Sequence, residues 1–331
     1  MSKLYPLVFE PILKEKVWGG RRLAGYGKTL PPGVNVGESW EIADLGATSP
    51  SGGGGGAERS VVAGGALAGA TLHDVVERWG EDLLGPRAPA EGGDFPLLVK
   101  FLDAGEHLSV QVHPDPDYAR AHPGAHLKNE SWYVLEAEPG AVIFKGVREG
   151  VDRETLARAL DDGTIVELIE AVPARPGDCH HLPSGTLHAL GAGVLVAEVQ
   201  TPSDTTFRLY DWTREYGREQ RTLHIEPALE CVRFSPPPAI TRLPSDRQAE
   251  RLAHTPEFDL WGCRTHAADG LALPEGRGCA VVMAVAGGVR VRSDGGAIDL
   301  PKGTTALIPA ATRDSTRVTA DQPTAFLVVT L

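Results

Sequence analysis

The stretch Leu108-Ser109-Val110-Gln111-Val112-His113 decides the fold class of this chain. Its apolar residues at 108, 110 and 112 alternate with polar residues at 109, 111 and 113, as in a β-strand whose side chains point to opposite faces. One face can therefore be buried in a core while the other presents a row of three polar groups. The apolar run 95–102 precedes this stretch, and we expect the two to be neighbouring strands joined by a short polar turn.

Further short runs of apolar, β-branched and aromatic residues predict strands at 131–135, 141–145, 179–182, 193–200 and 206–211. Two helices are expected. Thr71 can cap a helix over 72–79, where apolar side chains recur at helical spacing, and a second amphipathic stretch begins at Asp152 and is broken at Gly163. The chain is therefore predicted to be mainly β with short helical insertions.

A faint internal repeat predicts two related β-barrels. Residues 175–186 and 300–311 share a Pro/Gly turn, a short strand and a second Pro turn, although coincidence between two Pro-rich hairpins would look the same. The segment 234–244 contains three consecutive prolines and is the best linker candidate. We expect an N-terminal catalytic domain at 1–235 and a C-terminal barrel at 245–331. The second copy has no counterpart of His188, so we expect that barrel to lack a metal and to bury its apolar run 280–285 against the first barrel.

Composition limits the classes of partner. The chain has 331 residues, 32 of them basic and 44 acidic, with a formal net charge of −12, which argues against general nucleic-acid binding. The longest apolar stretch, 279–289, is far shorter than the roughly 18 residues of a membrane helix. The N-terminus has no signal-peptide pattern, and four scattered cysteines are typical of a reducing cytoplasm, where we expect the protein. A glycine-rich tract at 48–69 is expected to be a mobile loop.

Four polar residues of the right types could form a metal site. Gln111 and His113 share a strand face, Glu130 follows a polar excursion, and His188 lies after a Pro-Ser-Gly-Thr turn. An amide oxygen, two imidazoles and a carboxylate suit a borderline divalent ion such as zinc. A lone His or Gln on a strand is more often an ordinary hydrogen-bonded group than a ligand, and histidine is plentiful in this chain, with 11 in all. Spacing alone leaves both interpretations open.

Several motifs in the correct order resemble those of the type I mannose-6-phosphate isomerases of the short bacterial kind. They are 108–115, Lys128-Asn129-Glu130, 183–189 and 204–208, with N-terminal signatures at 10–11, 17–20 and 37–41. The resemblance is strong over about residues 5–215 and weak beyond. It implies a fold of two cupin-like barrels of the jelly-roll type and one divalent ion, for which zinc is the expected identity. The ligands implied are Gln111, His113, Glu130 and His188.

The implied reaction interconverts mannose 6-phosphate and fructose 6-phosphate through an enediolate. The resemblance places Lys128 and Arg208 in the active cavity, with Asp204 alongside. The metal and Arg208 could stabilise the negative charge of the enediolate. Lys128 could open the sugar ring or move protons, and His113, Glu130 or another group near the metal could share that work. Asp204 could orient Arg208, relay a proton or merely cap a turn.

The substrate phosphate is a dianion and needs cationic and hydroxyl partners. Ser109, on the polar strand face, and Lys100, on the adjacent predicted strand, are the candidates, ahead of Arg21 and Arg22. Glu41 could accept hydrogen bonds from sugar hydroxyls, as could Glu198, and a structural ion pair is the alternative for each.

Two rival functions keep the same fold. One is isomerisation of another sugar phosphate, and the other is a non-catalytic sugar-phosphate-binding regulatory cupin. The complete ligand set with Lys128 and Arg208 argues against loss of turnover. A small sugar phosphate is the expected partner, and we expect no nucleic acid, membrane or protein partner.

Overall fold

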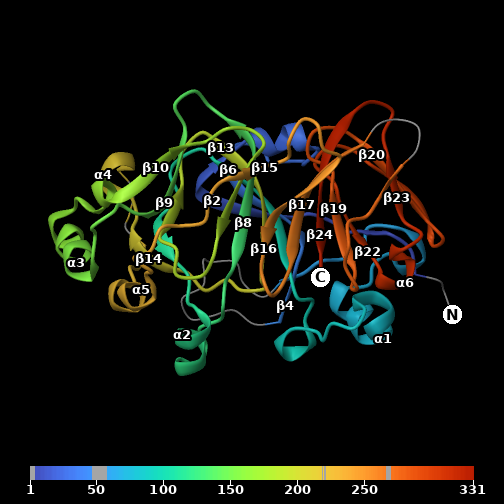
Figure 1. The fold of residues 1–331 in the computed structure, drawn as a ribbon, viewed down its shortest axis with the longest axis horizontal. Helices are drawn as coiled ribbons and strands as arrows, with labels where there is room; N and C mark the ends of the chain where they lie inside the picture. The colour runs from blue at the N-terminus through green and yellow to red at the C-terminus, as the bar shows by residue number, and fades with distance from the viewer. Residues whose placement is uncertain (1–3, 47–57, 218, 220, 266–269) are drawn as a thin grey trace.

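The computed structural model describes residues 4–46, 58–217, 219, 221–265 and 270–331. The mainly β expectation is confirmed, and most strands belong to two pairs of sheets that lie side by side. In Figure 1 the green and yellow strands of one pair occupy the left of the molecule, and the orange and red strands of the other occupy the right.

A seven-stranded and a five-stranded antiparallel sheet form the first pair. Across the larger sheet the order is β15 (Thr241–Arg242), β11 (Asp178–Leu182), β8 (Glu130–Ala137), β13 (Val194–Gln200), β6 (Leu98–Ala104), β2 (Ile12–Gly20) and β3 (Val36–Ile42). Across the smaller sheet it is β10 (Ile169–Pro173), β9 (Val142–Val147), β12 (His188–Leu190), β7 (Val110–Val112) and β14 (Phe207–Tyr210). One apolar cluster contains Leu102 and Trp132 of the larger sheet and Ile143 and Leu190 of the smaller, so the two sheets pack face to face.

The expectation that residues 95–102 and 108–113 form neighbouring strands joined by a short polar turn is wrong. Both segments form strands, but β6 pairs with β13, β2 and β3 in the larger sheet, whereas β7 pairs with β12 and β14 in the smaller. The intervening residues carry the chain from one sheet to the other. The alternation within 108–113 is confirmed, because Leu108, Val110 and Val112 are buried in apolar clusters.

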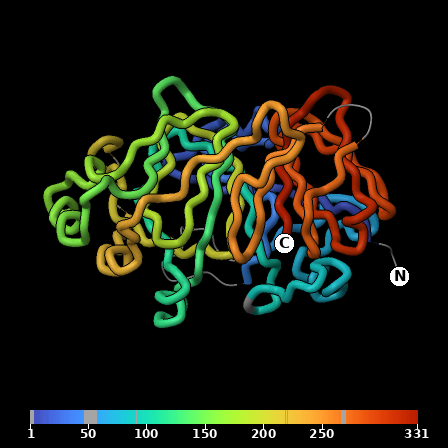
Figure 2. Tube along the Cα trace, in the orientation of Figure 1, coloured from blue at the N-terminus to red at the C-terminus, as the bar shows by residue number. Residues whose placement is uncertain are grey.

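The second pair of sheets comes mainly from the C-terminal region. Its six-stranded sheet has the order β1 (Leu7–Val8), β22 (Thr305–Ile308), β19 (Ala280–Met283), β24 (Thr324–Thr330), β17 (Asp259–Thr265) and β16 (Ala249–His254). Its four-stranded sheet has the order β18 (Leu271–Ala272), β23 (Arg317–Thr319), β20 (Val289–Ser293) and β21 (Gly296–Leu300). Strand β1 is N-terminal in sequence, so the blue start of the chain lies beside the red C-terminal strands (Figure 2).

Strand β19 joins the two halves of the molecule. Val281 and Met283 belong to a large core that also contains Phe101 and Leu195 of the first pair of sheets. Val282, which points the other way, belongs to the core between the two C-terminal sheets. One face of this apolar run therefore packs against the first pair of sheets, as expected, and the other face packs within the C-terminal pair.

The two expected helices are present. Thr71 caps α1 (Leu72–Leu84) in a capping box with Asp74, and α3 (Arg153–Asp162) ends at Gly163, whose φ of 72° is left-handed. Four further helices have at most seven residues and were not expected, because so short a helix shows little periodicity: α2 (Pro116–Ala121), α4 (Thr213–Tyr216), α5 (Ile225–Cys231) and α6 (Ala310–Arg313). The 3-10 helices are η1 (Arg22–Tyr26), η2 (Gly65–Leu67), η3 (Glu91–Gly93) and η4 (Ile165–Leu168).

A small sheet of β4 (Asp44–Leu45) and β5 (Glu58–Arg59) flanks part of the glycine-rich tract. Residues 48–57 of that tract, including the run 52–56, lie outside the described residues, and its described end contains β5 and η2 rather than loop alone. Within the described part of the chain, no helix is long and apolar enough to cross a membrane.

Candidate active site

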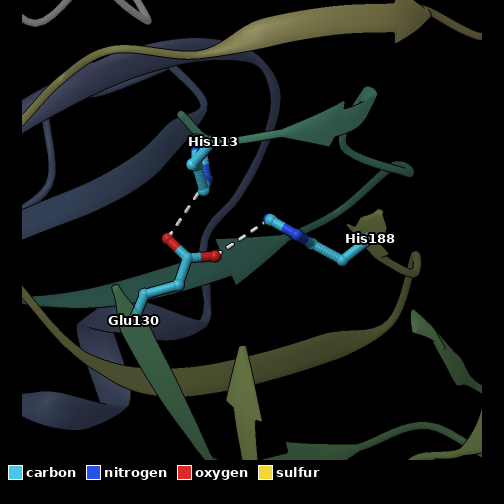
Figure 3. Close-up of side chains that lie close together, drawn as sticks. All are labelled: His113, Glu130 and His188. Atoms are coloured by element: carbon cyan, nitrogen blue, oxygen red, sulfur yellow. Dashed lines mark ion pairs between the residues drawn. The ribbon is translucent and has the colours of Figure 1, made fainter. Parts of the chain in front are cut away.

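Two histidines and a glutamate meet between the two sheets of the first pair. His113 follows β7, Glu130 begins β8 and His188 begins β12. Glu130 Oε1 lies 2.9 Å from His188 Nε2, and Glu130 Oε2 lies 3.4 Å from His113 Nε2, as the dashed lines in Figure 3 show. All three side chains are buried, and their ligand atoms lie within 4.8 Å of one another, which is close enough for one metal ion to contact them all.

Backbone carbonyls orient both imidazole rings. His113 Nδ1 lies 2.9 Å from the Thr205 carbonyl oxygen, and His188 Nδ1 lies 2.8 Å from that of Thr186. A carbonyl oxygen only accepts, so each Nδ1 carries a hydrogen, and each Nε2, which faces Glu130, is the nitrogen available to a metal. Among the described residues, His113 Nε2 and both Glu130 oxygens have no hydrogen-bond partner in acceptable geometry. Buried, convergent lone pairs of this kind fit a divalent cation.

Gln111 lies beside this cluster. It sits directly opposite His188 in the register of β7 and β12, and its amide nitrogen is 3.4 Å from His188 Nε2. Ser109 Oγ donates to Gln111 Oε1 at 3.2 Å. The structure thus brings together all four side chains expected as metal ligands.

Neighbouring groups favour the ionised form of Glu130, which is the form that binds a cation. Burial alone would raise the pKa of Glu130, but Lys128, His113 and His188 outweigh it and hold the pKa well below its usual range. Lys128 Nζ lies 2.9 Å from Glu130 Oε2. Burial, with a contribution from Lys128, lowers the pKa of His113 to about 3, so its ring is neutral and able to act as a ligand.

Rows of side chains from the two sheets form a pocket beside the cluster. On the larger sheet, adjacent strands align Trp40, Lys100, Glu198 and Trp132. On the smaller sheet, Arg208 of β14 and His188 of β12 flank Gln111 of β7. The pocket lining includes the following residues from both rows and the adjoining loop: Lys16, Glu38, Trp40, Lys100, Ser109, Gln111, Lys128, Trp132, Glu198, Ser203, Asp204, Thr206, Arg208 and Arg221.

Opposite charges pair along the larger sheet. Lys100 Nζ lies 3.0 Å from Glu198 Oε2 and 3.9 Å from Glu38 Oε2, and Lys16 Nζ lies 3.1 Å from Glu38 Oε1. Burial alone would raise the pKa of Glu38. The positive charges of Lys16 and Lys100 outweigh this effect and lower the pKa to about 2. For Glu198 burial dominates and the pKa is raised, although Lys100 opposes the shift. This wall of the pocket therefore carries carboxylates whose charges are balanced by lysines.

Arg208 is held by the loop that follows β14. Its Nη1 donates to the Thr222 carbonyl at 2.8 Å, and its Nε is 4.0 Å from Asp211 Oδ1. Burial and the neighbouring Arg221 lower the pKa of Arg208 to about 10, which leaves the guanidinium protonated at neutral pH. Its position opposite Gln111 puts this charge next to the metal-ligand cluster.

The structure brings most of the sequence-predicted site residues to this pocket, but Glu41 lies elsewhere. Ser109, Lys100 and Asp204 line the pocket. Glu41 points to the opposite side of β3, where Lys28 donates to its Oε2 at 2.7 Å and to the Gly303 carbonyl at 2.8 Å. This buried ion pair joins the two halves of the molecule, which matches the alternative that the sequence left open for Glu41.

Two other predicted cations also lie outside the pocket lining. Arg22 pairs with Asp103 and donates to backbone carbonyls, and Arg21 donates to the Pro31 carbonyl at 3.0 Å. Both therefore have structural partners of their own.

Sequence reasoning missed Glu38 and Arg221 as pocket residues. Glu38 could have been found, because side chains two apart on a strand share a face, and Trp40, two residues after Glu38 on β3, also lines the pocket. Arg221 lies in a loop after α4, and no local pattern marks it.

A second group of candidate metal ligands consists of Asp44, His73 and Asp94. Arg59 Nε lies 3.2 Å from Asp44 Oδ1, and its Nη2 lies 3.6 Å from Asp94 Oδ1. Asp44 also accepts from the Phe95 amide. Asp44 of β4 and Arg59 of β5 therefore belong to an ion-pair cluster with Asp94.

Comparison with known proteins gives a consistent result. The family model for the catalytic domain of type I phosphomannose isomerase matches residues 7–145. The mannose-6-phosphate isomerase ManA of Bacillus subtilis is 39% identical over 229 residues, which is 69% of this chain and 68% of that protein. The mannose-6-phosphate isomerase of Streptococcus mutans is 38% identical over 235 residues, which is 70% of this chain and 69% of that protein.

Solved structures extend the similarity to nearly the whole chain. The crystal structure of mannose 6-phosphate isomerase from Bacillus subtilis has a TM-score of 0.80 and 29% identity, and the match covers 98% of each chain. A mannose 6-phosphate isomerase structure described as bound with zinc and yttrium shares the fold, with a TM-score of 0.71 at 17% identity over 98% of this chain and 99% of that one.

Proposed function

This chain belongs to the type I phosphomannose isomerase family and is a mannose-6-phosphate isomerase, and we propose how its own residues carry out the reaction. The observation that carries the proposal is the buried group of His113, Glu130 and His188, with Gln111 beside it at one end of a charged pocket. A sugar phosphate is the substrate.

We assign the metal ligands to Gln111, His113, Glu130 and His188. Two neutral imidazoles, an amide and a carboxylate form a donor set that suits zinc. The support is the pair of rings fixed through Nδ1 and the buried Glu130 oxygens that converge with them. Bound there, zinc would supply a Lewis acid for the oxygen atoms of the reacting carbons.

We assign proton handling to Lys128 and Asp204, and charge stabilisation to Arg208. Opening the sugar ring requires a proton at the ring oxygen, and the buried ammonium of Lys128 can donate one from the floor of the pocket. Asp204, on the wall formed by residues 203–208, relays a proton between the substrate oxygens. Arg208, directly across from Gln111, donates hydrogen bonds to the oxygen that becomes negative in the enediolate.

The remaining pocket residues bind and orient the sugar. Ser109 and Lys100 are assigned to contact the substrate, as expected from their strand positions, and Glu38 and Glu198 can accept hydrogen bonds from its hydroxyls. Two tryptophans, Trp40 and Trp132, line the same wall and exclude water from the sugar.

The roles that we propose for the two parts of the chain follow the two pairs of sheets. Residues 1–235 would form the catalytic domain and residues 245–331 a metal-free barrel that stabilises it, with β1 contributed to the second barrel by the N-terminal segment. A cytoplasmic location belongs to the same proposal, and its support is the set of four cysteines, which are all buried as free thiols.

Removal of the metal should abolish activity. We expect the purified protein to carry one divalent ion per chain and to convert mannose 6-phosphate to fructose 6-phosphate in a coupled assay. Chelation should remove both the ion and the turnover, and added zinc should restore them. Full turnover of a metal-free preparation would contradict the metal assignment, and a second ion held by side chains of residues 245–331 would contradict the metal-free barrel.

Two neighbouring glutamates should respond differently to the same substitution. Glu41→Gln leaves the buried Lys28 ammonium without its counter-charge and should lower the free energy of unfolding by about 3 kcal/mol, with KM for mannose 6-phosphate unchanged. Glu38→Gln removes a charged acceptor from the pocket and should raise KM about tenfold. Denaturant unfolding and steady-state kinetics measure the two effects. A raised KM with wild-type stability in Glu41→Gln would show instead that Glu41 contacts the substrate.

A further inference from the structure

Arg221 stands out among the cations of the pocket because of how it is held. Its Nε donates to Asp211 Oδ1 and Oδ2 at 3.1 and 3.0 Å, its Nη2 also donates to Oδ1, and its backbone amide donates to Oδ2 at 3.1 Å. Asp211 is 3% exposed, so it is a fixed anchor. The guanidinium is therefore rigidly placed at the pocket, although about a third of the side chain remains exposed to solvent.

The lysines and the arginines of the pocket differ in how their charges are paired. Lys16 and Lys100 are paired with Glu38 and Glu198 along the larger sheet. At the other wall, the charged neighbours that act on Arg208 are Arg221 and Asp211, so two guanidinium groups share one carboxylate. Asp204 also lines the pocket, so this wall is distinguished by two adjacent guanidinium groups rather than by an excess of cations.

The smaller sheet places Arg208 beside an assigned metal ligand, and Asp211 holds Arg221 near Arg208. His188, Gln111 and Arg208 stand opposite one another on adjacent strands, and Asp211, to which Arg221 is bonded, follows Arg208 three residues along the chain. Arg208 is thus adjacent to an assigned metal ligand, whereas Arg221 is joined to Arg208 through Asp211. In mannose 6-phosphate the reacting carbons and the phosphate are at opposite ends of the carbon chain. With the reacting carbons at the metal ligands, the phosphate needs a cation elsewhere in the pocket, and Arg221 lines that pocket.

We propose that Arg221, held in place by Asp211, binds the phosphate group of the substrate. This inference rests on the proposed function and adds a residue to it. Within the described residues, Asp211 engages Nε and Nη2 of Arg221, which leaves Nη1 for a phosphate oxygen. A preorganised planar guanidinium suits a phosphate better than a flexible ammonium does.

The test compares Arg221→Gln and Arg221→Lys with Arg214→Gln, an exposed arginine of α4 that does not line the pocket. Loss of one charge-assisted contact is worth roughly tenfold to a hundredfold in affinity. Arg221→Gln should therefore raise both KM for mannose 6-phosphate and the inhibition constant of inorganic phosphate by that factor, with kcat within about threefold of wild type. Arg221→Lys should recover part of the loss, and Arg214→Gln should match the wild type.

Bound metal and the midpoint of thermal unfolding are measured on every variant, so that loss of the metal or of the folded structure is recognised. Arg221→Lys, which retains a cation for Asp211, keeps the test valid if Arg221→Gln is poorly folded. An unchanged inhibition constant for phosphate in a folded, metal-loaded Arg221 variant would overturn the proposal. So would a fall in kcat at constant KM.

The inference can fail separately from the proposed function. If the wild type does not turn over mannose 6-phosphate, calorimetric titration with inorganic phosphate still tests the subsite on the zinc-loaded protein. Weaker phosphate binding by Arg221→Gln than by the wild type would then support the subsite alone, and equal binding would refute it.

Discussion

Replacing either His113 or His188 by alanine is expected to remove the metal and the activity together. Each ring supplies one of two neutral nitrogen donors, and the three remaining ligands hold a divalent ion less tightly. A Lewis acid contributes several kcal/mol to stabilising the enediolate, so kcat/KM should fall by roughly a thousandfold or more. Metal content and turnover of mannose 6-phosphate measured on the same preparation check both expectations.

His122→Ala is the matched control, because His122 is exposed and stacks on Tyr118 in the α2 region, away from the metal ligands. It should retain both metal and turnover. Glu130→Gln should weaken metal binding more modestly than either histidine variant, since an amide oxygen can still coordinate but brings no negative charge. Stoichiometric metal with normal turnover in either histidine variant would refute the assigned ligand set.

Arg208→Ala should lower the rate of turnover without removing the metal. Arg208 faces Gln111 across β7 and β14, where its charge can stabilise an oxygen that becomes negative only as the enediolate forms. Loss of one such preorganised donor lowers kcat by on the order of a hundredfold or more. Bound metal should stay near the wild-type level, because Arg208 is not among the assigned ligands.

Arg208→Lys should recover only part of the rate, since an ammonium does not reproduce the planar donor fork. Steady-state kinetics distinguishes this role from that proposed for Arg221: loss of Arg208 acts mainly on kcat, and loss of Arg221 acts mainly on KM. If Arg208→Ala instead raised KM and kept kcat, Arg208 would bind substrate and transition state equally, and its catalytic assignment would be wrong.

Local sequence patterns were enough to predict several features of the structure. The alternation over 108–113 predicts a strand with a buried apolar face and a polar face, because backbone geometry alone sets the direction of successive side chains. Thr71 predicts the start of α1 for a similarly local reason, since its side chain bonds to backbone three residues away. The motifs around Gln111, Glu130 and His188 identified the candidate ligands before any contact between them was known.

Other features depended on which strands pair, and pairing joins residues far apart in the chain. Consecutive strands β6 and β7 could have formed a hairpin, and only the packing of two sheets shows that the chain crosses between them. Glu38 and Glu41 belong to the same motif, yet Glu38 lines the pocket and Glu41 forms a buried ion pair with Lys28.

The sequence by itself determined that the chain is mainly β and which residue types could bind a metal, because these depend on local alternation and on side-chain chemistry. The tertiary structure alone decided how charge is distributed in the pocket. Lys100 is balanced by Glu198, almost a hundred positions along the chain, whereas Arg208 and Arg221 share Asp211. The net field that a substrate meets depends on distances between such partners, and those distances exist only once the sheets have formed and packed.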